Sequence, residues 1–195
     1  MLRPVLLFDV METVVVEPFF EVACAVTGLE LPALWEQKNP DHWEEFEKAL
    51  IDEQFYCEHF FRDGRGIDRL ALRSALFDAY RWVDGMQELL AELAAAGWQM
   101  HTFSNYPIWF EMIEEKLQLS RYLKWTFVSH KTGLRKPDLR AYAYAYETLG
   151  VAPQDCLFVD DRDENIEAAR VVGMDAIRFI NTEALRSELS RRNVT

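Results

Sequence analysis

Four short polar motifs follow one another along the chain, and together they contain the groups that a phosphoryl-transfer site needs. Asp9 lies in the string FDVMET, Ser104 in FSNY and Lys136 in RKPD, and the pair Asp160–Asp161 lies in VDDRDEN. A nucleophilic carboxylate, a hydroxyl donor, a cation and a second acidic cluster can together bind Mg²⁺ and stabilise a transferring phosphoryl group. The order of these motifs is the main sequence evidence for function.

Asp9 is the candidate nucleophile. On its own, an aspartate after an apolar strand could cap the turn that contains Thr13. Within the four-part pattern we expect its carboxylate to attack phosphorus and form an aspartyl-phosphate, which splits one difficult displacement into two steps. Ser104 and Lys136 would then bind the transferring phosphoryl group, because a hydroxyl donor and a point charge stabilise its oxygens.

Asp160 and Asp161 are adjacent carboxylates that directly follow the apolar run Cys-Leu-Phe-Val. Two neighbouring carboxylates at the end of a buried strand repel one another unless a cation neutralises them. Mg²⁺ prefers such hard oxygen ligands and retains several waters. We therefore expect Asp161 and Asp9 to be direct ligands of Mg²⁺, and Asp160 to act from the second layer or through a water.

The elements that must position these groups alternate between apolar strands and helices. Glycines after the helical patterns, as in Leu149-Gly150 and Val172-Gly173, are typical of helix ends that turn back into a strand. This alternation predicts a Rossmann-like α/β core with a parallel sheet. The predicted strands cover residues 5–8, 98–103, 125–129, 156–159 and 176–179.

One long segment interrupts the alternation. It contains no convincing strand and is rich in aromatic residues, and its helical patterns lie around residues 19–26, 42–50, 53–61 and 70–80. An insertion after the first strand lies over the crevice where open α/β sheets bind ligands. We predict a helical cap at residues 17–83 and a core formed by residues 1–16 and 84–195.

These motifs resemble those of the haloacid dehalogenase superfamily of hydrolases, in the subgroup with a helical cap. The match covers nearly the whole chain, with 95 residues from Asp9 to Ser104, 32 more to Lys136 and 24 more to Asp160. The resemblance implies a Mg²⁺-dependent phosphatase in which the backbone carbonyl of Met11 is a third metal ligand. It also implies that Thr13 and Asn105 lie at the bound phosphate.

A narrower resemblance connects the chain to the branch that contains plant chloroplast flavin mononucleotide hydrolases. It rests on the strings FDVMET, EFEKALIDE, FFRDGR, NYPIW and GLRKPD, most of which carry no evident chemistry. It implies flavin mononucleotide as the first substrate to test.

The residue two positions after Asp9 departs from the usual superfamily pattern. Most phosphatases of the superfamily carry an aspartate there, which protonates the leaving oxygen and later activates water, but here it is Met11. A thioether cannot do acid or base work. Three explanations stay open: protonation by water or a cap residue, slow hydrolysis of esters with good leaving groups, or a different reaction. We expect the adjacent Glu12 to point away from the site.

The competing hypotheses belong to different classes. A 2-haloacid dehalogenase uses an aspartate nucleophile without a metal, which the acidic pair argues against. A phosphonatase needs a cap lysine for a Schiff base, for which Lys38 and Lys48 are available. A ligand-binding protein that has lost turnover through Met11 is the non-enzyme alternative.

Composition limits the partners. The formal net charge of −12 leaves no general basic surface for nucleic acid. No segment has the length and apolarity of a membrane span, and the three cysteines lack metal-ligand spacing. We expect a cytoplasmic protein, monomer or homodimer, that acts on a small phosphorylated metabolite.

Overall fold

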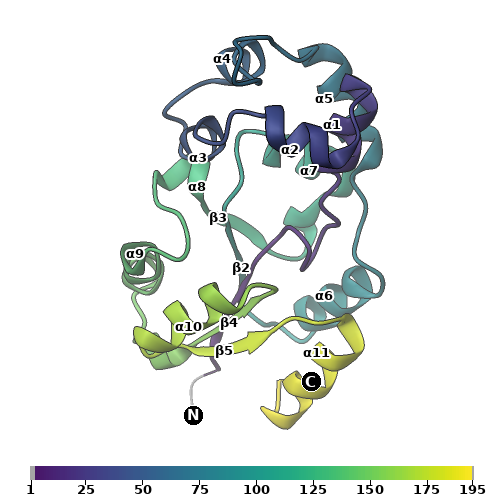
Figure 1. Ribbon diagram of the computed structural model, residues 1–195. Coiled ribbons are helices and arrows are strands. Elements are labelled where there is room, and N and C mark those ends of the chain that lie inside the picture. The colour runs from purple at the N-terminus through teal and green to yellow at the C-terminus, as the bar shows by residue number, and fades with distance from the viewer. Residues whose placement is uncertain (1–2, 195) are drawn as a thin grey trace.

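The computed structural model describes residues 3–194, and its centre is a parallel five-stranded sheet with strand order β3-β2-β1-β4-β5 (Figure 1). The two central strands, β1 and β4, are completely buried, which is why their sequences are continuously apolar. The predicted α/β fold is confirmed, with strand bounds within about two residues of the predictions. The strands are β1 (Val5–Phe8), β2 (Met100–Ser104), β3 (Lys124–Val128), β4 (Cys156–Asp160) and β5 (Asp175–Arg178).

Helices cover both faces of the sheet. Side chains alternate along β1, so that Leu6 and Phe8 belong to one apolar cluster and Val5 and Leu7 to another. The first cluster includes buried side chains of α6 (Met86–Ala95), α7 (Phe110–Leu117) and α11 (Thr182–Arg191). The second includes those of α9 (Leu139–Leu149) and α10 (Asp163–Val171). Short helical turns complete the chain at α8 (Ser129–Thr132), η1 (Leu119–Arg121) and η2 (Pro153–Asp155).

A group of five helices lies between β1 and α6 in the sequence, above the sheet in the view of Figure 1. These helices are α1 (Phe19–Thr27), α2 (Leu31–Gln37), α3 (His42–Glu47), α4 (Glu53–Glu58) and α5 (Arg69–Ala79). Four of them correspond to predicted helical segments. The sequence pattern predicts no helix at α2, where Pro32 reads as a breaker, but Pro32 occupies the first turn, a position in which proline is tolerated because no helical partner is lost.

The apolar cluster on one face of the sheet continues into these helices. Phe46 and Leu72 belong to the same cluster as Leu6 and Phe8. Trp109, which precedes α7, is fully buried and donates from Nε1 to Glu53 Oε1 at 2.5 Å. The division into a core and a cap at residues 17–83 stays a prediction. No helix within residues 3–194 is long and apolar enough to cross a membrane.

Candidate active site

Three of the predicted site residues meet where β1, β2 and β4 end at the same edge of the sheet. Asp9 directly follows β1 and extends its pairing, since its N–H donates to Val159 O at 2.9 Å. Ser104 and Asp160 are the last residues of β2 and β4. Parallel strands place their carboxyl ends together, so residues far apart in sequence converge here.

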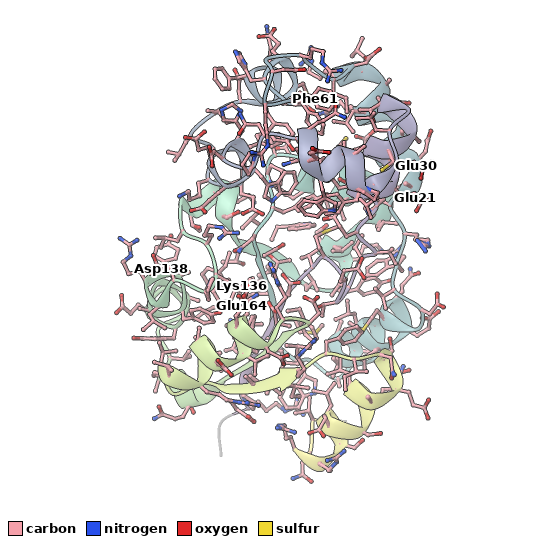
Figure 2. The ribbon with its side chains drawn as sticks, in the orientation of Figure 1. Glu21, Glu30, Phe61, Lys136, Asp138 and Glu164 are labelled. Carbon is pink, nitrogen blue, oxygen red and sulfur yellow. The ribbon has the colours of Figure 1, made fainter. Side chains whose placement is uncertain are left out.

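Lys136 lies between two of the carboxylates. Its Nζ is 2.7 Å from Asp9 Oδ1 and 2.5 Å from Asp160 Oδ2. Only 2% of Lys136 and none of Asp160 is exposed to solvent, and in Figure 2 the label of Lys136 lies below the helices α1–α3. Burial opposes the charge on Lys136, but the two carboxylates outweigh it and hold the pKa of the amine above its ordinary value. The lysine therefore stays protonated.

The backbone around Lys136 is fixed by Asn105. The Asn105 amide donates from Nδ2 to Lys136 O and accepts from Lys136 N through Oδ1, both at 2.8 Å. Asn105 also lines the cavity described below. Its contacts show a role in holding the lysine segment, while direct contact with substrate stays a prediction.

Asp160 is occupied by protein donors. Its carboxylate accepts from Arg162 N at 2.8 Å and from Asn165 Nδ2 at 3.0 Å, in addition to Lys136. Through these contacts Arg162 and Asn165 orient the Asp160 carboxylate. They also leave Asp160 little capacity for a further ligand.

The acidic cluster fits a divalent cation. Carboxylate oxygens of Asp9, Asp160 and Asp161 all lie within 4.8 Å of one another. Within residues 3–194, Asp161 forms no ion pair, and burial together with the charge of Asp160 raises its pKa. Burial also raises the pKa of Asp9 to about 7, despite the opposing charge of Lys136. A cation with a preference for hard oxygen ligands would relieve this unfavourable concentration of negative charge.

Two of the predicted site residues have a buried hydroxyl with no protein partner among the described residues. Ser104 Oγ and Thr13 Oγ1 are fully enclosed and form no hydrogen bond. Buried hydroxyls are normally satisfied, so these two are available to a bound group or water. Both are buried, and neither lines the open cavity.

A cavity of about 480 Å³ opens above the acidic cluster and extends beneath the helices α1–α3. Its volume lies within the range of sites for small organic ligands. Met11 and Glu12 both line it, and the Glu12 carboxylate accepts from Glu17 N at 2.7 Å. Glu12 therefore does not point away from the cavity, because the chain turns sharply after Met11 and Glu12 adopts a left-handed φ of 57°. The other lining residues are Asp9, Glu17, Phe19, Phe20, Trp35, Lys38, Pro40, Trp43, Glu47, Asn105, Tyr106, Arg135, Lys136, Asp161, Arg162 and Asn165.

Several cavity residues outside the four motifs carry groups that could take part in chemistry. Glu17 follows the turn after Asp9, and burial raises the pKa of its carboxyl to about 7. Glu47 and Arg135 form an ion pair at 3.0 Å, and Lys38 is buried rather than on the surface. Arg135 adjoins Lys136 in the sequence, and Lys38 is one of the two lysines available for a Schiff base. Glu17 and Glu47 carry no local sequence signal and reach the cavity through long-range packing.

The aromatic residues of the helical segment divide into two groups. Trp43 lines the cavity, and Phe20 and Trp35 form a stacked pair on its wall with ring centroids 4.6 Å apart. Tyr56, in contrast, is 1% exposed and stacks on Phe46 at 4.7 Å. Tyr56 is thus a packing residue, whereas Trp43, Phe20 and Trp35 are placed to contact a ligand.

Comparison with known proteins identifies the family. The model of the haloacid dehalogenase-like hydrolases matches residues 6–173. A chloroplastic flavin mononucleotide hydrolase of Arabidopsis thaliana is 47% identical over 187 residues, which cover 96% of this chain and 76% of that protein. A sesquiterpene phosphatase of Aspergillus oryzae is 28% identical over 159 residues, or 77% of this chain and 79% of that one.

Solved structures agree in fold. A haloacid dehalogenase family enzyme from Bacteroides thetaiotaomicron, in complex with magnesium, has a TM-score of 0.75 at 19% identity over 97% of this chain and 98% of that one. A predicted hydrolase of the same family from Porphyromonas gingivalis has a TM-score of 0.74 at 14% identity over 98% of both chains. The chain belongs to the haloacid dehalogenase-like hydrolases, as its four motifs predict.

Proposed function

We propose that the protein is a Mg²⁺-dependent phosphatase that hydrolyses flavin mononucleotide, or a closely related phosphomonoester, through an aspartyl-phosphate on Asp9. The observation that carries this proposal is the arrangement of Asp9, Lys136 and Asp161 at one end of a cavity large enough for an organic leaving group. The flavin is suggested by the relative that is 47% identical.

Asp9 and Lys136 have different roles in the first step, the formation of the aspartyl-phosphate. The Asp9 carboxylate forms a bond to phosphorus while the ester bond breaks and its electron pair leaves with the alcohol oxygen. Lys136, held 2.7 Å from Asp9, offsets negative charge as the phosphate approaches. Water then attacks the aspartyl-phosphate, which releases inorganic phosphate and restores the carboxylate. Flavin mononucleotide and water would give riboflavin and phosphate.

Mg²⁺ would be held by Asp9, Asp161 and the backbone carbonyl of Met11, with Asp160 in a supporting position. The geometry supports this division, because Asp9 and Asp161 line the cavity whereas Asp160 is fully buried and already accepts several hydrogen bonds. When bound, the ion supplies positive charge between the carboxylate and the phosphate.

The side chain that protonates the leaving oxygen is not Met11. Glu17 is the cavity carboxyl with a pKa raised to about 7, so it retains its proton to a higher pH than an ordinary glutamate. We include it as the first candidate for the acid, together with protonation by water.

The test is a screen of phosphate release over flavin mononucleotide, pyridoxal phosphate, sugar phosphates and nucleotides, each with Mg²⁺ and with a chelator. We expect release from flavin mononucleotide that requires Mg²⁺. Release of halide from a 2-haloacid in the presence of the chelator would instead identify a dehalogenase. Binding of flavin mononucleotide without any hydrolysis would identify a ligand-binding protein.

A further inference from the structure

Lys38 has surroundings that are unusual for a lysine. It caps the carboxyl end of α2, and only 7% of the residue is exposed. Its Nζ makes one hydrogen bond, to the neighbouring backbone oxygen Asn39 O at 3.2 Å. An ammonium has three donors, and burying one with so few acceptors costs free energy. Such an under-satisfied buried donor calls for an explanation, and the acceptors of a bound ligand would supply one.

No protein anion supplies them. Within the described part of the chain, no carboxylate lies within ion-pair distance of Lys38. Glu47, whose charge acts on Lys38, is engaged elsewhere, because its two oxygens accept from Trp43 Nε1 at 2.6 Å and from Arg135 Nε at 3.0 Å. Burial lowers the pKa of Lys38 to about 8, against the opposing charge of Glu47, so the amine is mostly protonated at pH 7. Lys38 is then a cation whose nearest protein anion is committed to other contacts.

Aromatic rings surround the Lys38 side chain, but they do not provide the hydrogen-bond acceptors that its ammonium group lacks. Its Nζ lies 5.8 Å from the ring centres of Trp43 and Tyr56 and 5.9 Å from that of Phe60. These distances are near the outer limit of a cation–π contact, so the rings stabilise the charge weakly. They also exclude water, which strengthens any hydrogen bond that a ligand makes here.

Lys38 belongs to the same cavity as the catalytic groups. The cavity is bounded by Asp9, Lys136 and Asp161 from the core segments and by Lys38, Trp43 and the stacked pair Phe20–Trp35 from the helices α1–α3. A phosphoryl group at Asp9 would leave the remainder of a substrate facing these helices. This part of the substrate would contact flat aromatic rings and the ammonium group of Lys38, which can only donate hydrogen bonds.

We propose that Lys38 is the specificity-determining residue of the cavity, and that its ammonium donates hydrogen bonds to ring carbonyl oxygens or ring nitrogens of a planar leaving group. The proposal rests on the proposed phosphatase function and narrows it to phosphomonoesters with an acceptor-rich aromatic ring. A lysine has no acceptor to offer, so leaving groups that present mainly hydroxyl donors are matched less well. Aromatic walls favour flat rings over short aliphatic groups.

The experiment compares Lys38→Met with wild type on flavin mononucleotide, which has ring carbonyls, and on phenyl phosphate, which has none. Loss of a charge-assisted hydrogen bond should raise KM for flavin mononucleotide by roughly tenfold to a hundredfold and leave kcat/KM for phenyl phosphate within about twofold. Lys38→Gln keeps an N–H donor and should recover part of the affinity. Lys48→Met is the matched control, because Lys48 lies on the neighbouring segment, pairs with Glu44 at 2.9 Å and is absent from this cavity.

A second measurement does not depend on turnover. Riboflavin, the dephosphorylated flavin, should quench the cavity tryptophan fluorescence on binding, and Lys38→Met should weaken this binding by the same factor as it raises KM. Equal riboflavin affinity in wild type and Lys38→Met, or no riboflavin binding by wild type, would overturn the proposal. An equal loss of kcat/KM on flavin mononucleotide and phenyl phosphate would also overturn it. So would a larger loss of kcat/KM on a short phosphate ester that carries a carboxylate. Failure of wild type to hydrolyse any phosphomonoester would overturn the phosphatase function itself, and the riboflavin result would still decide the role of Lys38.

Discussion

Arg135 Nε donates a hydrogen bond to Glu47 Oε2 at 3.0 Å, and this contact connects α3 to the segment that carries Lys136. Glu47 is 4% exposed, so the ion pair is formed largely out of water. A second link lies beside it, because Ser129 Oγ donates to Glu47 O at 2.9 Å. Glu47 and Arg135 belong to the strings EFEKALIDE and GLRKPD, which in sequence showed kinship without evident chemistry. In the structure these strings together connect α3 to the segment that carries Lys136.

Glu47→Gln should therefore lower both stability and rate. Removing the charged partner of Arg135 should reduce the free energy of unfolding by about 1.5–3 kcal/mol. The less firmly held Lys136 should reduce kcat by about tenfold. Denaturant unfolding and steady-state kinetics measure the two effects. Glu45→Gln on the same helix is the control, since Glu45 takes part in no ion pair within residues 3–194. An unchanged kcat would show that Lys136 does not depend on this link.

Asp161→Asn should change the metal requirement. The variant loses one of the two carboxylates of the acidic cluster that line the cavity, so the Mg²⁺ concentration for half-maximal activity should rise at least about tenfold. Asp163→Asn, in the exposed pair with Arg178, should behave as wild type. Titration of activity with Mg²⁺ gives the result. Undiminished turnover of wild type in a chelator would refute the metal site.

Met11→Asp should restore an acid two residues after the nucleophile. Wild-type rates should depend steeply on the pKa of the leaving alcohol, so that aryl phosphates react faster than alkyl phosphates. The variant should flatten this dependence, chiefly by accelerating the alkyl esters, and Met11→Asn should not. A leaving-group series on the three proteins is the test. A flat response in wild type would mean that another residue, for which Glu17 is the first candidate, already supplies the proton.

Glu17 also predicts a pH dependence of stability. Burial raises its pKa from 4.5 to about 7, so between these values the unfolded chain has released a proton that the native state retains. The free energy of unfolding should therefore fall as the pH rises from about 4.5 to 7, and this part of the dependence should be absent in Glu17→Gln. Thermal unfolding at pH 5 and pH 7.5, both with a chelator, compares the two proteins. The exposed Glu21 on α1, labelled in Figure 2, provides the control Glu21→Gln. Parallel profiles for wild type and Glu17→Gln would contradict the prediction.

The parts of the structure that the sequence predicts follow from local sequence patterns, whereas the other parts depend on contacts between distant segments. The strand β1 and the Asp9 that follows it are specified by a local apolar run, and apolar runs likewise place Ser104 and Asp160 at the ends of β2 and β4, on either side of β1. Lys136 lies instead in the loop after α8, and it reaches the two carboxylates from there. The helix α2 was missed because Pro32 reads as a breaker unless its position in the first turn is known. The burial of Lys38 is not predictable from the sequence, because it depends on rings of Trp43 and Phe60 that no local pattern brings together.

The central claim is that Asp9 accepts the phosphoryl group. Because Met11 provides no base for the second step, the aspartyl-phosphate formed from an aryl phosphate should break down more slowly than it forms and should accumulate. The direct measurement is acid quenching during turnover, followed by peptide mapping by mass spectrometry, with Asp9→Asn as the control. The expected result is a phosphoryl group on Asp9 in wild type and none in the variant. A burst of leaving-group release without a phosphoryl group on Asp9, or with one on another residue, would contradict the mechanism.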